Sequence, residues 1–313
     1  MRRQKKIILV FGGSGFIGSH IINNLLKKIN KNKYKIINIS KKNKYTSPYV
    51  SNYLLDLSKI KNIKKVINLK PDYIFYAISL NHFQSEINFS KTMSTNFFNL
   101  ALILDNEKFT KNIKTINYIS TAQVYGDNTQ IYSENTMVNP LNKYALTHYL
   151  CEEYLRFFYL KKKINTNIFR ISNTYGPPIF KHTDCWWTAF NNFCFNSFYK
   201  SIITINSHGY QKRDFIFICD AIKKILGKSF KKNAFCIYNI GSHNSKTILE
   251  MAKKIRRVAY KVLKKKIILN IKQKKPQYFK SNFVFRSNFF EKSIMNNTNN
   301  HIMKTLNYLA KWK

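Results

Sequence analysis

Three glycines recur at a spacing of three near the start of the sequence, in Gly12-Gly13-Ser14-Gly15-Phe16-Ile17-Gly18. The first glycine permits a tight turn, the second lets a ligand approach the backbone, and the third lets a helix pack against a strand. Where such a loop opens a helix, it presents free N–H groups and a partial positive charge to phosphate. The spacing therefore predicts that a dinucleotide pyrophosphate lies on Gly12, Gly15, Phe16, Ile17 and Gly18.

The segments on either side of the loop have the patterns that this role requires. Residues 6–11 form a short apolar run, which is typical of a buried parallel strand. Apolar residues then recur at helical spacing from 16 to 29, and a second strand is predicted at 34–39. Strand, turn, helix and strand thus follow one another over the length of one βαβ unit.

The end of the second predicted strand bears on the choice of coenzyme. In the usual NAD-binding pattern an acidic residue stands there and binds the adenosine ribose. Here Ser40 stands there, followed by Lys41 and Lys42. Serine and lysine would accept a ribose 2′-phosphate that a carboxylate would repel, so we expect NAD(P) with a preference for NADP. The alternative is that these lysines belong only to the general lysine excess.

Asp56 and Leu57 follow a third predicted strand and complete the expected coenzyme site. Asp56 could accept a hydrogen bond from the adenine amino group. The alternative role for Asp56 is to cap the N-terminus of a helix at 59–69.

Strands and helices continue to alternate beyond this unit. Helices are predicted at 60–69, 91–107 and 145–162, and strands at 73–78, 115–120 and 168–171. This alternation predicts an α/β fold with a doubly wound, parallel Rossmann sheet.

The sequence pattern changes after Gly176-Pro177-Pro178, where a segment rich in aromatic residues and without regular spacing begins. We expect a dinucleotide-binding domain at 1–175 and a smaller, C-terminal substrate-binding lobe at 176–313. Strands are predicted at 201–206 and 213–218, and a helix at 245–262. A strand and helix at 215–230 are expected to return to the main sheet, so that part of 215–245 belongs to the first domain. Residues 263–313 give no clear pattern.

The charge of the chain is strongly positive: 54 Lys and Arg stand against 14 Asp and Glu, a formal charge of +40. Such a balance can indicate binding to nucleic acid or to an anionic membrane. The lysines are scattered, however, and accompany abundant Asn, Ile, Tyr and Phe, which favours compositional drift. Binding to nucleic acid is therefore not expected, although the positive field should attract phosphorylated ligands.

The five cysteines include no CxxC pair, which argues against a disulfide framework and a zinc site. The histidines show no ligand spacing, so no metal is expected. The apolar run at 7–11 is too short for a signal peptide, and no stretch reaches the roughly 18 apolar residues that cross a bilayer. We expect a cytoplasmic protein without a membrane partner.

Several segments together resemble the extended short-chain dehydrogenase/reductases, the NAD(P)-dependent epimerase/dehydratase family. The glycine loop is similar to the family's glycine signature, and Tyr144-Ala145-Leu146-Thr147-His148 lies where the family carries Tyr-x-x-x-Lys. Four further segments match in order: Ser120–Gly126, Arg170–Pro177, Arg213–Ile216 and Tyr238–Gly241. The resemblance extends over residues 1–260 or so.

The resemblance implies a nucleotide-sugar substrate and hydride transfer between a sugar carbon and the nicotinamide. By this resemblance Thr121 would hydrogen-bond the sugar hydroxyl and Tyr144 would take its proton. Asn173 and Arg213 would bind the nucleotide-sugar, with Arg213 on a phosphate through its planar donor fork. Among epimerase, dehydratase and reductase we favour epimerase, because Ala122-Gln123 stands where a dehydratase carries an acidic pair.

The chain departs from the family pattern at position 148, where histidine replaces lysine. Tyr144 and His148 are four residues apart on a predicted helix and share one face. A tyrosine base needs a pKa below its ordinary value near 10, which a neighbouring cation provides. Histidine, with an unperturbed pKa near 6.5, is mostly neutral at pH 7 but can still bind the coenzyme ribose. The alternatives are a weakly active or inactive nucleotide-binding homologue and, third, a nucleic-acid-binding protein.

Other residues have less specific interpretations. Trp186-Trp187 could line a sugar pocket, but a core role is preferred. Glu152 and Glu153 are interpreted as solvated or helix-pairing charges, and Asp220 as the cap of a helix at 221–226. Residues 148–160 are amphipathic and could face the core or a second subunit, so a homodimer is possible.

Overall fold

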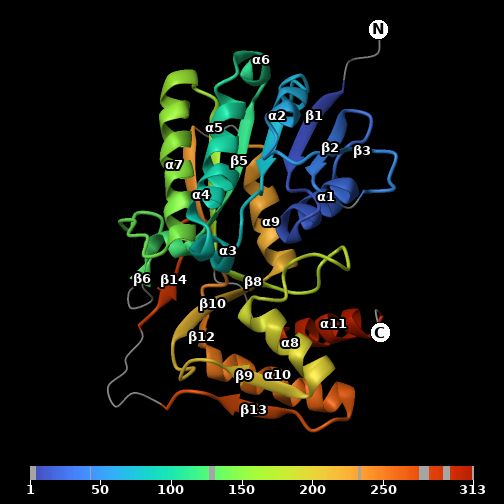
Figure 1. The fold of residues 1–313 in the computed structure, drawn as a ribbon, viewed down its shortest axis with the longest axis vertical. Coiled ribbons are helices and arrows are strands. Elements are labelled where there is room, and N and C mark those ends of the chain that lie inside the picture. The colour runs from blue at the N-terminus through green and yellow to red at the C-terminus, as the bar shows by residue number, and fades with distance from the viewer. Residues whose placement is uncertain are drawn as a thin grey trace. The chain divides into compact units, whose positions relative to one another are not determined.

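The structure is a computed structural model, and it describes residues 5–42, 44–126, 131–231, 234–274, 282–291 and 297–311. Two compact units share the chain. The first contains Met1–Gly126, Met137–Arg170 and Ile222–Tyr238. The second contains Asp127–Thr136, Ile171–Ala221 and Asn239–Lys313. Figure 1 labels the elements of both units, which are described one at a time below.

A seven-stranded sheet organises the first unit, and its strand order is β3-β2-β1-β4-β5-β7-β11. The pairs around β1 run parallel, as they do between β2 and β3 and between β4 and β5. This is the doubly wound order of the Rossmann fold, with one further strand, so the predicted fold class is confirmed. The strands are β1 Lys6–Phe11, β2 Tyr34–Ser40, β3 Val50–Leu54, β4 Tyr73–Tyr76, β5 Thr115–Thr121, β7 Asn165–Ile171 and β11 Phe235–Ile240.

Helices pack on both faces of this sheet, as the burial of successive positions along its strands requires. On one face the core joins the sheet to α2 Ile60–Ile67, α5 Asn99–Leu104 and α7 Lys143–Lys162. On the other face lies α1 Phe16–Lys28, which buries Ile21, Ile22 and Leu25. The ring of Phe230, just beyond α9 Ile218–Ser229, packs against Tyr73 and Phe75 of β4.

The helix predicted at 91–107 is confirmed over residues 91–104. There α4 Phe89–Thr92, the π-helix η1 Met93–Phe98 and α5 follow one another without a break, and a turn at Asp105 ends this stretch. The short helix α3 His82–Ile87 precedes it, and α6 Glu107–Thr110 follows it. Asparagine side chains start α3, α4 and α6: Asn81, Asn88 and Asn106 each accept from backbone N–H groups of the next turn. Asparagine favours this capping role over a place inside a helix, so Asn106 marks the boundary before α6.

Among its described residues, the second unit has three small sheets and three longer helices. β10 Lys212–Phe217 lies between β12 Ser245–Thr247, to which it is antiparallel, and β8 Asn173–Tyr175, to which it is parallel. β9 Ile202–Ile205 pairs with β13 Ile268–Ile271, and β6 Ile131–Tyr132 pairs with β14 Val284–Phe285. The helices are α8 Ala189–Lys200, α10 Ile248–Leu263 and α11 Thr298–Ala310.

The expectation that the strand beginning near 215 returns to the main sheet is wrong. β10 pairs with β8 and β12, and β11 is the strand that joins the main sheet beside β7. The buried Asp214 explains the placement, since its carboxylate accepts from the hydroxyls of Ser172 and Ser242 and from the backbone N–H of Asn244. This network fixes β10 within the second unit.

Within the described residues, no helix is both long enough and apolar enough to cross a membrane.

Candidate functional site

The glycine loop connects β1 to α1 in close contact with its neighbours. Gly12 has a φ of +72°, a conformation that favours glycine, and a Cβ there would lie 2.6 Å from the Ala77 carbonyl oxygen. A Cβ on Gly18 would collide with the Gly12 carbonyl. By contrast, a Cβ on Gly15 would meet only the Gly12 carbonyl oxygen, at 3.1 Å. The loop therefore packs tightly against its neighbours at Gly12 and Gly18, and it has more room beside Gly15.

The first turn of α1 suits an anion. Gly15 is the N-cap and has no side chain to satisfy the first backbone N–H groups, and no acidic residue lies in this turn. Those N–H groups have no partner within the helix and carry the positive end of its dipole. The residues Phe16, Ile17 and Gly18 thus form a cradle that fits a pyrophosphate.

The end of β2 is held by a short chain of hydroxyl groups. The Ser14 hydroxyl donates to Ser40 Oγ at 2.9 Å, and the Ser40 hydroxyl donates to the Lys42 carbonyl oxygen at 2.9 Å. The Tyr45 hydroxyl donates to the Gly13 carbonyl oxygen at 2.8 Å. These contacts tie the segment after β2 to the glycine loop, within the first unit.

Asp56 and Leu57 lie just beyond β3. Lys41 Nζ forms an ion pair with Asp56 Oδ1 at 3.0 Å, and both Ser58 N–H and its hydroxyl donate to the same oxygen. Burial would raise the pKa of Asp56, but these hydrogen bonds and Lys41 lower it to about 2. The alternative in which Asp56 caps the next helix is wrong: the N-cap of α2 is Lys59, and Asp56 closes a turn before it. Leu57 is buried.

Tyr144 and Thr121 come together where β5 ends and α7 begins. The hydroxyls of Thr121 and Ser79 lie close to the Tyr144 hydroxyl. Burial raises the pKa of the Tyr144 phenol above its ordinary value of 10, although both hydroxyls act in the opposite direction. Asn142 starts α7 by accepting from the Ala145 N–H at 2.8 Å, which fixes the first turn that carries Tyr144.

His148 lies one turn farther along α7, as the spacing predicted. Its ring packs edge-on against the Tyr144 ring, with centroids 4.6 Å apart. His148 Nδ1 is 2.8 Å from the Tyr118 hydroxyl, while Nε2 is buried and has no hydrogen-bond partner among the described residues. Burial lowers the pKa of His148 to about 3, so the ring is neutral at pH 7. The unpartnered Nε2 fits a ligand that brings its own hydrogen-bonding group.

Ser79 and Asn96 are site residues that the sequence analysis missed. Asn96 lies in the π-helix η1, and its side chain accepts from the Leu80 N–H at 2.8 Å and donates to the Thr147 hydroxyl at 2.9 Å. It therefore holds the segment that contains Ser79 against α7. One sequence signal points to this region: polar residues follow β4, at the carboxyl edge of a parallel sheet.

The interpretation of Glu152 as a solvated charge is wrong, whereas Glu153 is exposed and pairs with Arg156. The Glu152 carboxylate is buried, 2.6 Å from Arg170 Nη2, and it also accepts from the Ser120 hydroxyl. Arg170 Nη1 in turn donates to the Tyr125 hydroxyl at 2.9 Å. Since Ser120 precedes Thr121, this buried network fixes the end of β5.

Asn173 and Arg213 lie in the second unit, on the paired strands β8 and β10. Asn173 is exposed, and its Nδ2 donates to the Asp214 carbonyl oxygen at 3.1 Å. Arg213 Nη1 donates to the Lys212 carbonyl oxygen at 2.9 Å, and burial lowers the pKa of its guanidinium. The small sheet therefore carries both residues.

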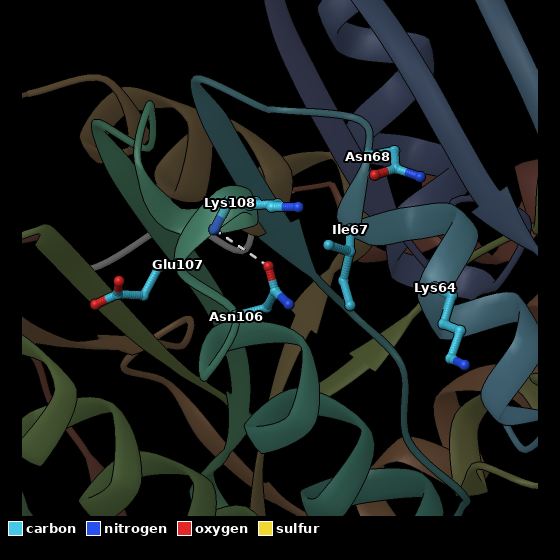
Figure 2. A pocket seen from close by; sticks show the side chains of 6 residues that line it. All are labelled: Lys64, Ile67, Asn68, Asn106, Glu107 and Lys108. Carbon is cyan, nitrogen blue, oxygen red and sulfur yellow. Dashed lines mark hydrogen bonds between the residues drawn. The ribbon is translucent and has the colours of Figure 1, made fainter.

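Each unit has a hollow lined by described residues. One, of about 500 Å³, is drawn in Figure 2 between the end of α2 and the start of α6, and Lys64, Asn106 and Lys108 line it. These helices precede β4 and β5, so the hollow lies at the amino edge of the sheet, away from the edge where such folds bind ligands. The other, of about 410 Å³, lies in the second unit and is lined by Trp186, among others.

The parallel sheet, the glycine cradle and the hydroxyl cluster at the carboxyl edge define a dinucleotide-binding α/β enzyme fold. Residues 8–241 match the family model described as the NAD dependent epimerase/dehydratase family. The chain belongs to this family. The match confirms the resemblance inferred from the sequence, and with it oxidoreductase-type chemistry dependent on NAD.

Similar proteins act on sugar nucleotides, as their names state. The dTDP-D-glucose 4,6-dehydratase of Mus musculus is 24% identical over 266 residues, which cover 80% of this chain and 72% of that protein. A putative UDP-glucose 4-epimerase of Methanocaldococcus jannaschii is 28% identical over 251 residues, covering 78% and 80%.

Among solved structures, a UDP-N-acetylglucosamine 4-epimerase from Methanobrevibacter ruminantium is similar with a TM-score of 0.83 and 20% identity, covering 99% of this chain and 100% of that one. The UDP-glucuronic acid 4-epimerase from Bacillus cereus, solved with UDP-glucuronic acid and NAD, has a TM-score of 0.79 at 20% identity, covering 98% and 100%. At this identity the likeness supports the fold.

Proposed function

We propose that this chain is a nucleotide-sugar epimerase in which Tyr144 is the catalytic base. The observation that carries the proposal is the contact of the Tyr144 hydroxyl with Thr121 and Ser79, one helical turn from the unpartnered Nε2 of His148. All four residues belong to the first unit, which also contains the glycine loop.

The pyrophosphate of the coenzyme would lie on the backbone of Gly12, Gly15, Phe16, Ile17 and Gly18. Its adenosine would lie beside Ser40, Lys41, Asp56 and Leu57. Its nicotinamide ribose would lie beside Tyr144 and His148. When bound, it supplies the hydride acceptor and donor. The uncapped amides of α1 bind its negative charge, and the unpartnered His148 Nε2 fits a ribose hydroxyl.

In the proposed reaction, a single protein atom, Tyr144 Oη, transfers the proton. Tyr144 Oη takes the proton of the sugar hydroxyl as that carbon is oxidised, and it returns the proton on reduction of the other face. Thr121 orients the same hydroxyl. Because burial raises the pKa of Tyr144 and His148 is neutral, the reaction should quicken as pH rises from 7 toward 10.

Epimerisation is favoured over dehydration by the turn η2 Ala122–Tyr125 that follows Thr121. Elimination of water needs a further acid or base beside the sugar, and this turn carries only uncharged side chains. Gln123 uses its Oε1 to accept from Asn142 at 3.1 Å.

The coenzyme preference is proposed to be NADP, because Ser40 rather than a carboxylate ends β2. Lys41 forms an exposed ion pair with Asp56. A 2′-phosphate could take the place of Asp56 as the partner of Lys41 with little loss of free energy, because exposed ion pairs contribute little. Comparing the dissociation constants of NAD and NADP for wild type and Ser40→Asp tests this: the aspartate should weaken NADP selectively. Equal weakening of both coenzymes would contradict it.

In the second unit, Asn173 and Arg213 are proposed to bind the nucleotide part of the substrate. A half-buried guanidinium on a strand can hold a diphosphate through two parallel hydrogen bonds. Arg213→Lys should raise KM for the sugar nucleotide and leave coenzyme affinity unchanged, since lysine keeps the charge but loses the fork.

A homodimer is also proposed, through the outer face of the helices that pair along one side of the first unit. Leu146, Phe157 and Leu160 are exposed at helical spacing on α7, and Phe98 and Leu102 are exposed on η1 and α5 beside it. Exposed large apolar side chains on neighbouring helices are typical of a protein interface. Sedimentation should give twice the chain mass, and Phe157→Lys should give a monomer.

The direct test of function incubates the protein and coenzyme with UDP-glucose, UDP-N-acetylglucosamine, UDP-glucuronic acid and dTDP-glucose in turn, and separates sugar epimers by chromatography. We expect one of these to epimerise, and Tyr144→Phe to slow the reaction by about 10²–10⁴-fold without loss of coenzyme binding.

The second candidate, an inactive nucleotide-binding homologue, is favoured by the neutral His148. Turnover of none of these sugars by a protein that binds coenzyme, before and after His148→Lys, would support this candidate and overturn catalysis.

A further inference from the structure

Tyr118 occupies a position that the proposed chemistry does not use. It lies on β5, three residues before Thr121, and it is almost fully buried. Its hydroxyl is 2.8 Å from His148 Nδ1, 30 residues away in the sequence. The aromatic centroids of Tyr118 and His148 are 5.8 Å apart, so the strand and the helix approach closely at this point.

The two ring nitrogens of His148 differ in their surroundings. Nδ1 contacts Tyr118, whereas Nε2 is buried with no hydrogen-bond partner among the described residues. A neutral imidazole carries one proton, and the contact made by one nitrogen decides which nitrogen holds it. The Tyr118 contact therefore decides whether Nε2 is a donor or an acceptor.

The surroundings of the Tyr118 hydroxyl favour one direction. Its phenol stays protonated, because burial holds its pKa well above the ordinary value. The other group beside it is the Cys151 thiol, whose Sγ is 3.2 Å from the Asn96 carbonyl oxygen and donates there. Sulfur is a weak acceptor and an imidazole nitrogen is a stronger one, so the phenol proton points to Nδ1.

We propose that Tyr118 is a positioning residue: its hydroxyl donates to His148 Nδ1, which fixes the ring proton on Nε2 and leaves the Nε2–H to donate to a ribose hydroxyl of the coenzyme. This inference rests on the proposed function for the identity of the acceptor. It explains how a neutral histidine serves where the family resemblance implies a lysine: the tautomer presents a donor at the same place on the helix. It does not replace the lysine's charge, so Tyr144 keeps a high pKa.

Nuclear magnetic resonance of the full chain, labelled with ¹⁵N in its histidines, tests the tautomer without coenzyme or turnover. Long-range ¹H–¹⁵N correlations distinguish a protonated ring nitrogen from an unprotonated one, and His148→Gln identifies the signals. We expect protonated Nε2 and unprotonated Nδ1 in the wild type. A protonated Nδ1 would overturn the proposal, whatever the activity of the protein.

Tyr118→Phe removes only the hydroxyl, and Tyr76→Phe is the matched control. Tyr76 is the neighbouring buried tyrosine, with ring centroids 6.2 Å apart, and its own hydroxyl has no partner among the described residues. Tyr118→Phe should mix the two tautomers and weaken coenzyme binding by a few-fold to about tenfold, the effect of one lost hydrogen bond. Tyr76→Phe should change neither.

Two results would overturn the proposal: a tautomer that Tyr118→Phe leaves unchanged, or a coenzyme affinity that falls equally in both variants. Failure of every sugar to react, with the tautomer and coenzyme titrations as expected, would count against the proposed function and leave the role of Tyr118 standing.

Discussion

The glycine loop and the cluster around Tyr144 and His148 belong to the same unit, but they hold their ligands in different ways. The loop offers backbone N–H groups, and its requirement is for the absence of side chains at Gly12 and Gly18. The cluster offers side chains whose protons depend on burial and on their neighbours.

The difference explains where the chain departs from its family pattern. A backbone site leaves no room for side chains where its turn needs glycine, so the three-residue glycine spacing is intact. A side-chain site can exchange one donor for another if a neighbour adjusts it, as Tyr118 is proposed to do for His148. The neutral ring loses the charge that a lysine would bring, and the tyrosine base is left with a raised pKa.

The largest expected effect comes from closing the backbone site. Gly18→Ala places a methyl group against the Gly12 carbonyl, so the loop must shift. Overpacking of this kind costs about 1–3 kcal/mol of unfolding free energy, and the displaced amides should no longer bind coenzyme. Calorimetric titration and thermal unfolding measure the two effects.

Gly227→Ala is the matched control, because it lies inside α9 and a Cβ there meets nothing within 4 Å. This variant should gain about 0.5–1 kcal/mol in unfolding free energy and keep its coenzyme affinity. Equal loss of binding in both variants would show that the loop is not the binding element.

After this loss of coenzyme binding, the next largest effect is on stability, and it comes from the buried ion pair of Glu152 and Arg170. Glu152→Gln leaves Arg170 charged and buried, which should lower the free energy of unfolding by about 3–5 kcal/mol. Glu153→Gln, next in the chain, breaks an exposed pair with Arg156 and should cost at most about 1 kcal/mol. Denaturant unfolding of the two variants would contradict this account if their losses were equal.

A smaller effect sharpens the assignment of a neutral His148. Its folded-state pKa is lowered to about 3, so between pH 6.5 and 3 the unfolded chain binds a proton that the folded chain does not. Its contribution to stability is therefore complete above pH 6.5 and is lost on acidification, at about 1.4 kcal/mol per pH unit.

Between pH 6.5 and pH 5 the wild type should thus lose about 2 kcal/mol more unfolding free energy than His148→Gln. The exposed His182→Gln is the control and should follow the wild type. Parallel curves for wild type and His148→Gln would mean that burial does not lower the pKa of His148, so that the ring gains its proton in the folded chain as it does in the unfolded chain.

Local patterns predicted the first half of the Rossmann sheet, because short apolar runs and a glycine turn are neighbours in the sequence. They did not predict that Glu152 is buried, since its partner Arg170 is 18 residues away on another element. The contact between Tyr118 and His148 and the bridge from Asn96 to Leu80 are equally non-local. Helix α11 at Thr298–Ala310 was missed because its lysine- and asparagine-rich surroundings hide its buried Ile302, Leu306 and Leu309.

Calorimetric titration of the folded protein with NAD and with NADP tests the central claim most directly. The account predicts saturable binding of at least one coenzyme to the wild type and its loss in Gly18→Ala. Absence of saturable binding for both coenzymes at millimolar concentration, or undiminished binding in Gly18→Ala, would contradict it.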